Sequence, residues 1–199
     1  REREKVEGSL ENVLVTSGGV EALNLICMAL VDAGDTVIVG APTYLIALHV
    51  FRTYEARIVP VRVDGEGLDT AELETRLSEL EREGVRPKLV YAIPAFQNPA
   101  GVTLSGARRR HLVEICERFQ IPVVEDHAYA DLRFQGDPLP SLKSLAPDNV
   151  VLVQTFSKIF SPGARLGYVF AGPPLVRRLG LCKIGTDSCA NTLCQRLLF

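Results

Sequence analysis

The sequence is most informative at residues 150–168, which read VVLVQTFSKIFSPGARLGY. The apolar run at 150–154 predicts a strand buried on both faces, as in a parallel sheet. Lys158 follows this strand closely, and open α/β sheets bind their ligands at the carboxyl ends of their strands. A desolvated amine near other cations loses its proton more easily and becomes a usable nucleophile. The segment therefore predicts an α/β sheet with a reactive lysine at its edge.

Groups suited to a phosphate surround this lysine. Arg165 lies seven residues beyond Lys158, and arginine offers a rigid fork of donors. The hydroxyl groups of Thr155 and Ser157 add further donors. A lysine beside a phosphate site suggests pyridoxal phosphate as a cofactor. For an isolated Ser-Lys pair, a solvated surface lysine is the alternative interpretation.

A second apolar run ends in a carboxylate. Residues 121–129 read IPVVEDHAY and predict another strand, with Asp126 at its end. A carboxylate beside a pyridine nitrogen favours the protonated ring, which can then act as an electron sink. Asp126 is the candidate for that role. A cap on the following helix is the alternative for an isolated Asp in this place.

A third junction between strand and loop lies at residues 89–101, which read LVYAIPAFQNPAG. Asn-Pro-x-Gly is ordinary turn chemistry, so by itself it is weak evidence for a site. Asn98 is the candidate polar group of this loop, and a role in the turn alone remains open.

Residues 13–23 read VLVTSGGVEAL and predict a short strand that leads through small residues into a helix. A helix N-terminus approached by glycines offers backbone N–H groups and the positive end of the helix dipole to an anion. Gly18, Gly19 and Val20 are therefore candidates for binding a phosphate. The Gly-x-Gly-x-x-Gly spacing of dinucleotide-binding folds is absent.

Residues 36–44 read TVIVGAPTY and predict a strand closed by a loop. The ring of Tyr44 could stack on a planar heteroaromatic ligand. Simple packing of this tyrosine at a helix start is the alternative.

Taken together, and in their order along the chain, the motifs resemble those of fold-type I pyridoxal-phosphate enzymes, specifically the class I and II aminotransferases. Ser-Lys-x-x-x-Pro-Gly-x-Arg-x-Gly resembles their Schiff-base segment, which implies that Lys158 holds the cofactor. Asp-x-Ala-Tyr resembles their pyridine-binding motif, which implies that Asp126 faces the ring nitrogen and Tyr129 the phenolic oxygen. Asn-Pro-Ala-Gly resembles the motif whose Asn, here Asn98, donates to the same oxygen. The family also has an aromatic stacking residue at the position of Tyr44.

The phosphate segment departs from the family. The family pattern Gly-Ser-Gln-Gln-Ala-Leu has Ser, Gln and Gln where this chain has Gly19, Val20 and Glu21. Backbone N–H groups can still bind the phosphate, whereas the Glu21 carboxylate would have to point away from it.

The order of the elements predicts an α/β fold, a mostly parallel seven-stranded sheet with helices on both faces, as in the aminotransferase large domain. Strands are expected near residues 13–16, 36–40, 57–63, 88–93, 121–126, 150–155 and 166–171, and the clearest helices at 69–83 and 105–119. The resemblance spans about residues 12–193. It implies that residues 1–199 form the cofactor-binding large domain, incomplete at both ends. The small C-terminal domain, whose arginine grips the substrate carboxylate, is expected beyond Phe199.

The resemblance implies a pyridoxal-phosphate-dependent aminotransferase that works as a homodimer and moves an amino group between an amino acid and a 2-oxo acid. An effector-sensing domain of a transcription regulator is the main alternative. Another fold-type I enzyme, such as a lyase or decarboxylase, and an inactive folding domain also remain open.

Composition excludes some partners. The formal charge is −2 and there is no basic stripe, so no nucleic-acid partner is expected. The cluster Arg108–Arg110 falls in a predicted helix, where a solvated face would explain it. No apolar run approaches the roughly 18 residues of a membrane span. The first residues, Arg1–Lys5, do not read as a signal peptide, so a cytoplasmic location is expected.

The five cysteines form neither a Cys-x-x-Cys pair nor a zinc pattern, and free buried thiols are expected. The three histidines are scattered, so no metal site is predicted. Among them, His127 lies next to Asp126, close enough to influence it.

Overall fold

The computed structural model describes residues 8–199, so the charged segment Arg1–Lys5 lies outside the described residues. The strands are β1 (Val13–Thr16), β2 (Thr36–Ala41), β3 (Arg57–Asp64), β4 (Gly67–Leu68), β5 (Leu89–Ala92), β6 (Val123–Asp126), β7 (Val150–Thr155) and β8 (Gly167–Phe170). The helices are α1 (Gly19–Leu30), α2 (Leu45–Thr53), α3 (Thr70–Arg82), α4 (Gly106–Arg118), α5 (Leu142–Leu145), α6 (Pro173–Ile184) and α7 (Thr192–Leu198). Short 3₁₀ turns are η1 (Leu10–Asn12), η2 (Ala130–Leu132) and η3 (Pro162–Ala164).

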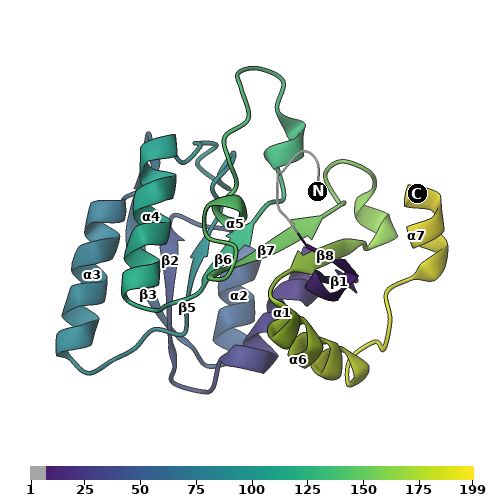
Figure 1. The fold of residues 1–199 in the computed structure, drawn as a ribbon, viewed down its shortest axis with the longest axis horizontal. Coiled ribbons are helices and arrows are strands. Elements are labelled where there is room, and N and C mark those ends of the chain that lie inside the picture. The colour runs from purple at the N-terminus through teal and green to yellow at the C-terminus, as the bar shows by residue number, and fades with distance from the viewer. Residues whose placement is uncertain (1–7) are drawn as a thin grey trace.

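The described strands form one sheet in the order β1-β8-β7-β6-β5-β2-β3-β4 (Figure 1). The central strands β3, β2, β5, β6 and β7 are parallel, whereas β8 is antiparallel to both β7 and β1. The predicted α/β class and all seven predicted strands are confirmed. The eighth strand, β4, was not predicted, because its two residues are too few to show any periodicity.

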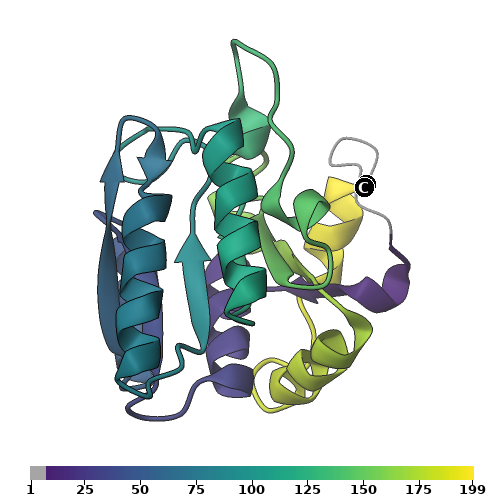
Figure 2. The same ribbon diagram turned by 60° about the vertical axis from the view of Figure 1, so that its left-hand side comes forward.

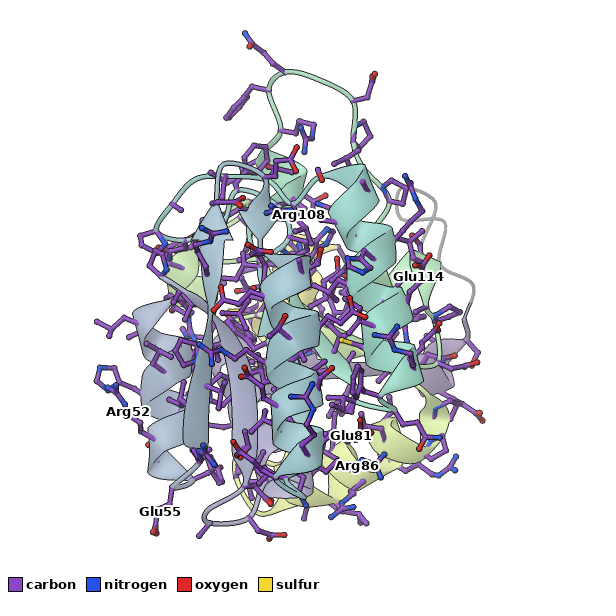
Figure 3. All side chains as sticks on the ribbon, turned by 90° about the vertical axis from the view of Figure 1, so that its left-hand side faces the viewer. Arg52, Glu55, Glu81, Arg86, Arg108 and Glu114 are labelled. Atoms are coloured by element: carbon purple, nitrogen blue, oxygen red, sulfur yellow. The ribbon has the colours of Figure 1, made fainter. Side chains whose placement is uncertain are left out.

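Helices cover both faces of the sheet. Side chains alternate along β2, where Val37 and Val39 pack with α1, α2 and α6, while Ile38 packs with α3, α4 and α5. Seen from the β3 edge, α2 lies on one side of the sheet and α3 and α4 on the other (Figure 3). Burial on both faces explains why the central strands read as continuous apolar runs.

The two helices predicted at 69–83 and 105–119 are confirmed, and each observed end differs from the predicted one by a single residue. The Asp69 side chain accepts hydrogen bonds from the amides of Ala71 and Glu72 and so caps α3. Ser105 caps α4 in the same manner. These polar caps satisfy amide groups that a helix start leaves unpaired, which explains why the helices begin at these residues.

The sheet topology gathers several loops at one edge. Two antiparallel reversals, β7 to β8 and β8 to β1, give β1 the same direction as β7. The chain therefore leaves β1, β2, β5, β6 and β7 at the same edge, which is the upper edge in Figure 2. In open α/β sheets this carboxyl edge is where ligands bind.

The expected solvated face for the cluster Arg108–Arg110 is wrong for Arg109. Only 2% of Arg109 is exposed, and its guanidinium donates to the backbone carbonyls of Leu104, Pro140 and Pro94. Arg108 is half-buried and pairs with Asp64, whereas Arg110 is exposed. The physical reason is that backbone carbonyl groups at the carboxyl edge of the sheet need hydrogen-bond donors. The residue pattern of the helix does not reveal that such carbonyl groups lie near Arg109.

The cysteines are free, but only two of them are buried, Cys27 and Cys116. Burial raises the pKa of each of these two thiols to about 12. Cys189 is exposed and the other two are half-buried, which corrects the expectation that all five are buried. In the part of the chain that the structure describes, no helix is long and apolar enough to cross a membrane.

We predict that Arg109→Met lowers the free energy of unfolding by about 3 kcal/mol, because it leaves buried carbonyls without their donor. The exposed neighbour provides the matched control, since Arg110→Met should change the free energy by less than about 0.5 kcal/mol. Urea titrations of both variants measure the difference. Equal effects would show that Arg109 contributes no more than a surface arginine.

Candidate active site

A pocket of about 150 Å³ lies at the carboxyl edge of the sheet. The residues predicted from the sequence that line it are Gly19, Val20, Tyr44, Asn98, Asp126, Tyr129, Thr155, Ser157, Lys158 and Arg165. Four lining residues were not predicted: Leu23, Ile93, Ala128 and Pro162. Ala128 and Pro162 lie within the quoted motifs without having been given a role, whereas Leu23 and Ile93 are apolar and nothing in the sequence distinguishes them from core residues. Five strand ends therefore contribute to one pocket.

Gly18 is the one predicted residue that does not line the pocket, and it lies against Arg165 instead. Its φ is 92°, and a Cβ there would come within 2.6 Å of Nη2 of Arg165. Glycine is therefore needed both for the backbone angle and for the close approach of the guanidinium. Nη2 of Arg165 donates to the carbonyl oxygen of Ser17 over 3.3 Å, which ties this turn to the η3 loop.

The other hydrogen-bond donors at this end of the pocket lie beside Arg165. Nη1 of Arg165 lies 3.5 Å from Oγ of Ser157, and Oγ1 of Thr155 lies 3.0 Å from the same oxygen. Gly19 and Val20 form the first turn of α1, where amide groups point out of the helix start. A guanidinium, two hydroxyl groups and a helix N-terminus together suit an anion such as a phosphate.

Glu21 points away from this anion site, as expected. Its carboxylate accepts a hydrogen bond from the amide of Ser17 and two from Nζ of Lys183, and it is absent from the pocket lining. The acidic residue in the first turn of α1 is thus paired with a cation.

Asp126 also lines the pocket and is held by Tyr91. The hydroxyl of Tyr91 donates to Oδ2 of Asp126 over 2.6 Å, and the amide of Ala128 donates to Oδ1 over 3.2 Å. Burial raises the pKa of the Asp126 carboxyl, while these two hydrogen bonds and the nearby His127 and Lys158 act in the opposite direction. The predicted influence of His127 on Asp126 is therefore confirmed.

Tyr91 was missed by the sequence analysis, which treated it as part of an apolar strand. Its side chain is fully buried and contacts Phe51 edge to face, with 5.6 Å between ring centroids. Burial raises the pKa of Tyr91 well above its usual value, and the Asp126 charge raises it further. The one available signal was a tyrosine in β5, a strand next to the one that ends in Asp126.

Polar and aromatic groups occupy the middle of the pocket. Nδ2 of Asn98 donates to the hydroxyl of Tyr129 over 3.3 Å, so the two residues that were predicted to share a ligand oxygen already contact each other. The pKa of Tyr44 is raised by burial and by the proximity of Asp126 and Tyr129. Tyr44 therefore lies across the pocket from β6.

Lys158 lies at the mouth of the pocket, and its Nζ is 5.8 Å from the centroid of the Tyr129 ring. The side chain is exposed, which corrects the expectation of a desolvated amine. Lys158 lies three residues beyond the end of β7, in the loop that leads to η3. Burial of the amine would require additional atoms over the pocket.

Within residues 8–199 no group of His, Cys, Asp and Glu side chains is arranged to hold a metal ion.

We predict that Tyr91→Phe raises the pKa of the Asp126 carboxyl, because the hydroxyl of Tyr91 stabilises the ionised form and phenylalanine cannot donate. A ¹³C NMR titration of the carboxyl measures this. Tyr54→Phe is the control, since Tyr54 packs against the core at the far end of α2 and should leave the titration of Asp126 unchanged. An unchanged pKa in Tyr91→Phe would contradict the assigned role.

Comparison with known proteins agrees with this geometry. The profile of the family described as aminotransferase class I and II matches residues 2–196. The chain is 42% identical to aromatic-amino-acid aminotransferase 1 of Thermococcus litoralis, over 98% of this chain and 47% of the relative. It superimposes with a TM-score of 0.93 on the kynurenine aminotransferase of Pyrococcus horikoshii, crystallised with PMP, at 40% identity over 98% of this chain and 48% of that one.

The relatives also include a protein of another class. The uncharacterized HTH-type transcriptional regulator YisV of Bacillus subtilis is 33% identical over 96% of this chain and 39% of the relative. The chain spans less than half the length of each of these proteins. Because the family profile matches nearly its whole length, the chain belongs to the aminotransferase class I and II family.

Proposed function

We propose that the chain is the cofactor-binding domain of a pyridoxal-phosphate-dependent aminotransferase, which moves an amino group from an amino acid to a 2-oxo acid. The observation that carries the proposal is the convergence of Lys158 and Arg165, from the segment after β7, and of Asp126, at the end of β6, on one pocket. Similarity to an aminotransferase of T. litoralis and to one crystallised with PMP supports it.

The donor set of the pocket fits pyridoxal phosphate. An amine suits a carbonyl group, a carboxylate suits a pyridinium nitrogen, and a guanidinium with two hydroxyl groups suits a phosphate. Lys158 and Arg165 lie at the mouth, while Asp126 is held deeper by Tyr91. The pocket thus offers a cation for the phosphate and a carboxylate for the ring nitrogen.

Each residue then has a role. Arg165, Thr155, Ser157 and the first turn of α1 bind the phosphate, and Tyr44 packs against the ring. Asn98 and Tyr129 donate hydrogen bonds to the phenolic oxygen. Asp126, fixed by Tyr91, keeps the ring nitrogen protonated. When bound, pyridoxal phosphate supplies a carbonyl that takes up the amino group and a ring that withdraws electrons.

Lys158 has two tasks in this proposal. Its amine would hold the cofactor covalently at rest, and as a free amine its Nζ would take the proton from the α-carbon of the substrate. A mobile lysine at the mouth can reach the substrate carbon, and the exposed side chain of Lys158 is free to do so.

Three further features belong to the same proposal. The aminotransferase relative is more than twice as long as this chain, which supports a small domain and a carboxylate-binding arginine outside residues 1–199. Leu45 and Ile46, directly after Tyr44, are 59% and 39% exposed, and this supports a homodimer that covers them beside the pocket. The free thiols support a cytoplasmic location.

An effector-sensing domain of a transcription regulator is the second candidate, and the similarity to YisV favours it. Such a domain would bind the same cofactor and an amino compound, yet it would not need to release product. Turnover of an amino acid and a 2-oxo acid by the full-length protein separates the two candidates, because repeated turnover requires both half-reactions.

We predict that Lys158 carries the cofactor. Borohydride reduction after incubation with pyridoxal phosphate should attach the label to the peptide that contains Lys158, and Lys158→Ala should abolish it. Two lysines act as internal controls. Lys143 donates to the carbonyl of Val150, and burial lowers its pKa to about 8, whereas Lys183 is paired with Glu21. Label on either of them instead would disprove the assignment.

We predict that Asp126→Asn retains cofactor binding but lowers turnover of the full-length protein at least about a hundredfold, because an amide cannot favour the protonated ring nitrogen as a carboxylate does. Steady-state kinetics measure the loss. Asp137→Asn, at an exposed position of the loop after η2, is the matched control and should behave as wild type. Near-normal turnover of Asp126→Asn would mean that Asp126 serves only the local turn.

A further inference from the structure

An ion-pair cluster centred on the buried Lys183 lies beside the turn that leads into α1, and it joins Lys183 to Glu21 and to Asp187, whose side chain is 31% exposed. Nζ of Lys183, on α6, donates to both carboxylate oxygens of Glu21 over 2.9 Å and to Oδ1 of Asp187 over 2.6 Å. Only 4% of Lys183 is exposed. Burial acts against the charged form, but the hydrogen bonds with Asp187 and Glu21 outweigh it and raise the pKa of Lys183. The amine therefore stays protonated and offsets one of two carboxylate charges.

Both carboxylates also hold Ser17. The amide of Ser17 donates to Oε2 of Glu21, and its hydroxyl donates to Oδ2 of Asp187 over 2.5 Å. Lys183 thus fixes the two groups that fix Ser17. Because α1 and α6 are far apart in the sequence, this arrangement exists only in the folded chain.

Ser17 leads directly to the pocket. Its carbonyl accepts a hydrogen bond from Nη2 of Arg165, and the next residue, Gly18, lies against the same guanidinium. Gly19 then lines the pocket. A continuous series of contacts consequently runs from Lys183 through Glu21 and Ser17 to Arg165, which we assign to the phosphate.

The positive charge of Lys183 also bears on phosphate binding, in addition to these contacts. Without Lys183, the carboxylates of Glu21 and Asp187 would lie near each other and near the site for a phosphate dianion. Like charges that lie close together repel each other where water screens them only in part, and the repulsion falls with distance. Repulsion would displace Glu21 from Ser17 and would oppose the anion directly.

We propose that Lys183 is a positioning residue for phosphate binding: it neutralises Glu21, so that an acidic residue in the first turn of α1 supports the phosphate site instead of repelling the anion. This inference rests on the proposed function. It also accounts for a departure from the family pattern, since the Gln side chains of that pattern are replaced by Val20 and Glu21.

A purely structural tie between α6 and α1 is the competing explanation, and charge separates the two. The Gln side chain in Glu21→Gln keeps an oxygen that can accept the hydrogen bond from the Ser17 amide, but it carries no negative charge. Lys183 keeps its ion pair with Asp187 in this variant. The charge argument therefore predicts that Glu21→Gln binds phosphate at least as well as wild type. A structural tie predicts that it loses affinity as Lys183→Met does.

The experiment compares pyridoxal phosphate with pyridoxal, which lacks the phosphate, by equilibrium dialysis against the full-length protein. Lys183→Met should weaken the binding of pyridoxal phosphate about tenfold, which corresponds to about 1.4 kcal/mol, and should change the binding of pyridoxal much less. The double variant Glu21→Gln/Lys183→Met should recover most of the loss. Lys88→Met, which removes a partner of Asp35 in another part of the fold, is the matched control and should bind as wild type.

Three results would overturn the inference. These are an equal loss for both ligands in Lys183→Met, no recovery in the double variant, and a loss in Glu21→Gln as large as that in Lys183→Met. If the thermal melting curve shows that Lys183→Met does not fold, the comparison of Glu21→Gln with wild type still decides, because a tenfold loss of pyridoxal phosphate affinity in Glu21→Gln contradicts the charge argument. Wild-type protein that binds pyridoxal phosphate no better than pyridoxal would reject the proposed function and the inference with it, whereas wild-type binding with an unchanged Lys183→Met rejects the inference alone.

Discussion

The shared direction of β1, β2, β5, β6 and β7 is the constraint on which the site depends. Strands that run the same way end at the same edge, so residues from five distant parts of the chain meet there. The reversal through β8 matters as much as the parallel core, because it brings the end of β1 beside the end of β7. The start of α1 and Arg165 become neighbours for this reason.

Buried polar groups hold these strand ends in place. Arg109 donates a hydrogen bond to the carbonyl of Pro94, just before the loop that contains Asn98, and the Tyr91 hydroxyl donates to one carboxylate oxygen of Asp126. On the opposite face of β6, Glu125 accepts hydrogen bonds from the amides of Leu142 and Lys143. A buried donor or acceptor that loses its partner costs about 1–3 kcal/mol, so each pair resists movement of the loop that it holds. The pocket is therefore supported from within the core.

Much of the fold could be read from local patterns. Apolar runs gave the seven longer strands, and amphipathic patterns gave the two helices expected at 69–83 and 105–119. The sequence analysis failed where a residue's environment comes from elsewhere in the chain. Arg109 looked like one of three surface arginines, Tyr91 like a core aromatic, and Lys158 like a buried amine. Burial and partners of these side chains follow from strand ends that are distant in sequence, which no local pattern contains.

Residue type and spacing alone determined which groups are chemically available: an amine after one strand, a carboxylate after another, and glycines before a helix. Period-two alternation also required that Glu125 and Asp126 face opposite sides of β6. Only the tertiary structure decided which of the two reaches the pocket, and that the acidic Glu21 is neutralised by Lys183 from α6. The physical reason is that electrostatic pairing and burial depend on distance in space, and strand order in the sheet sets that distance.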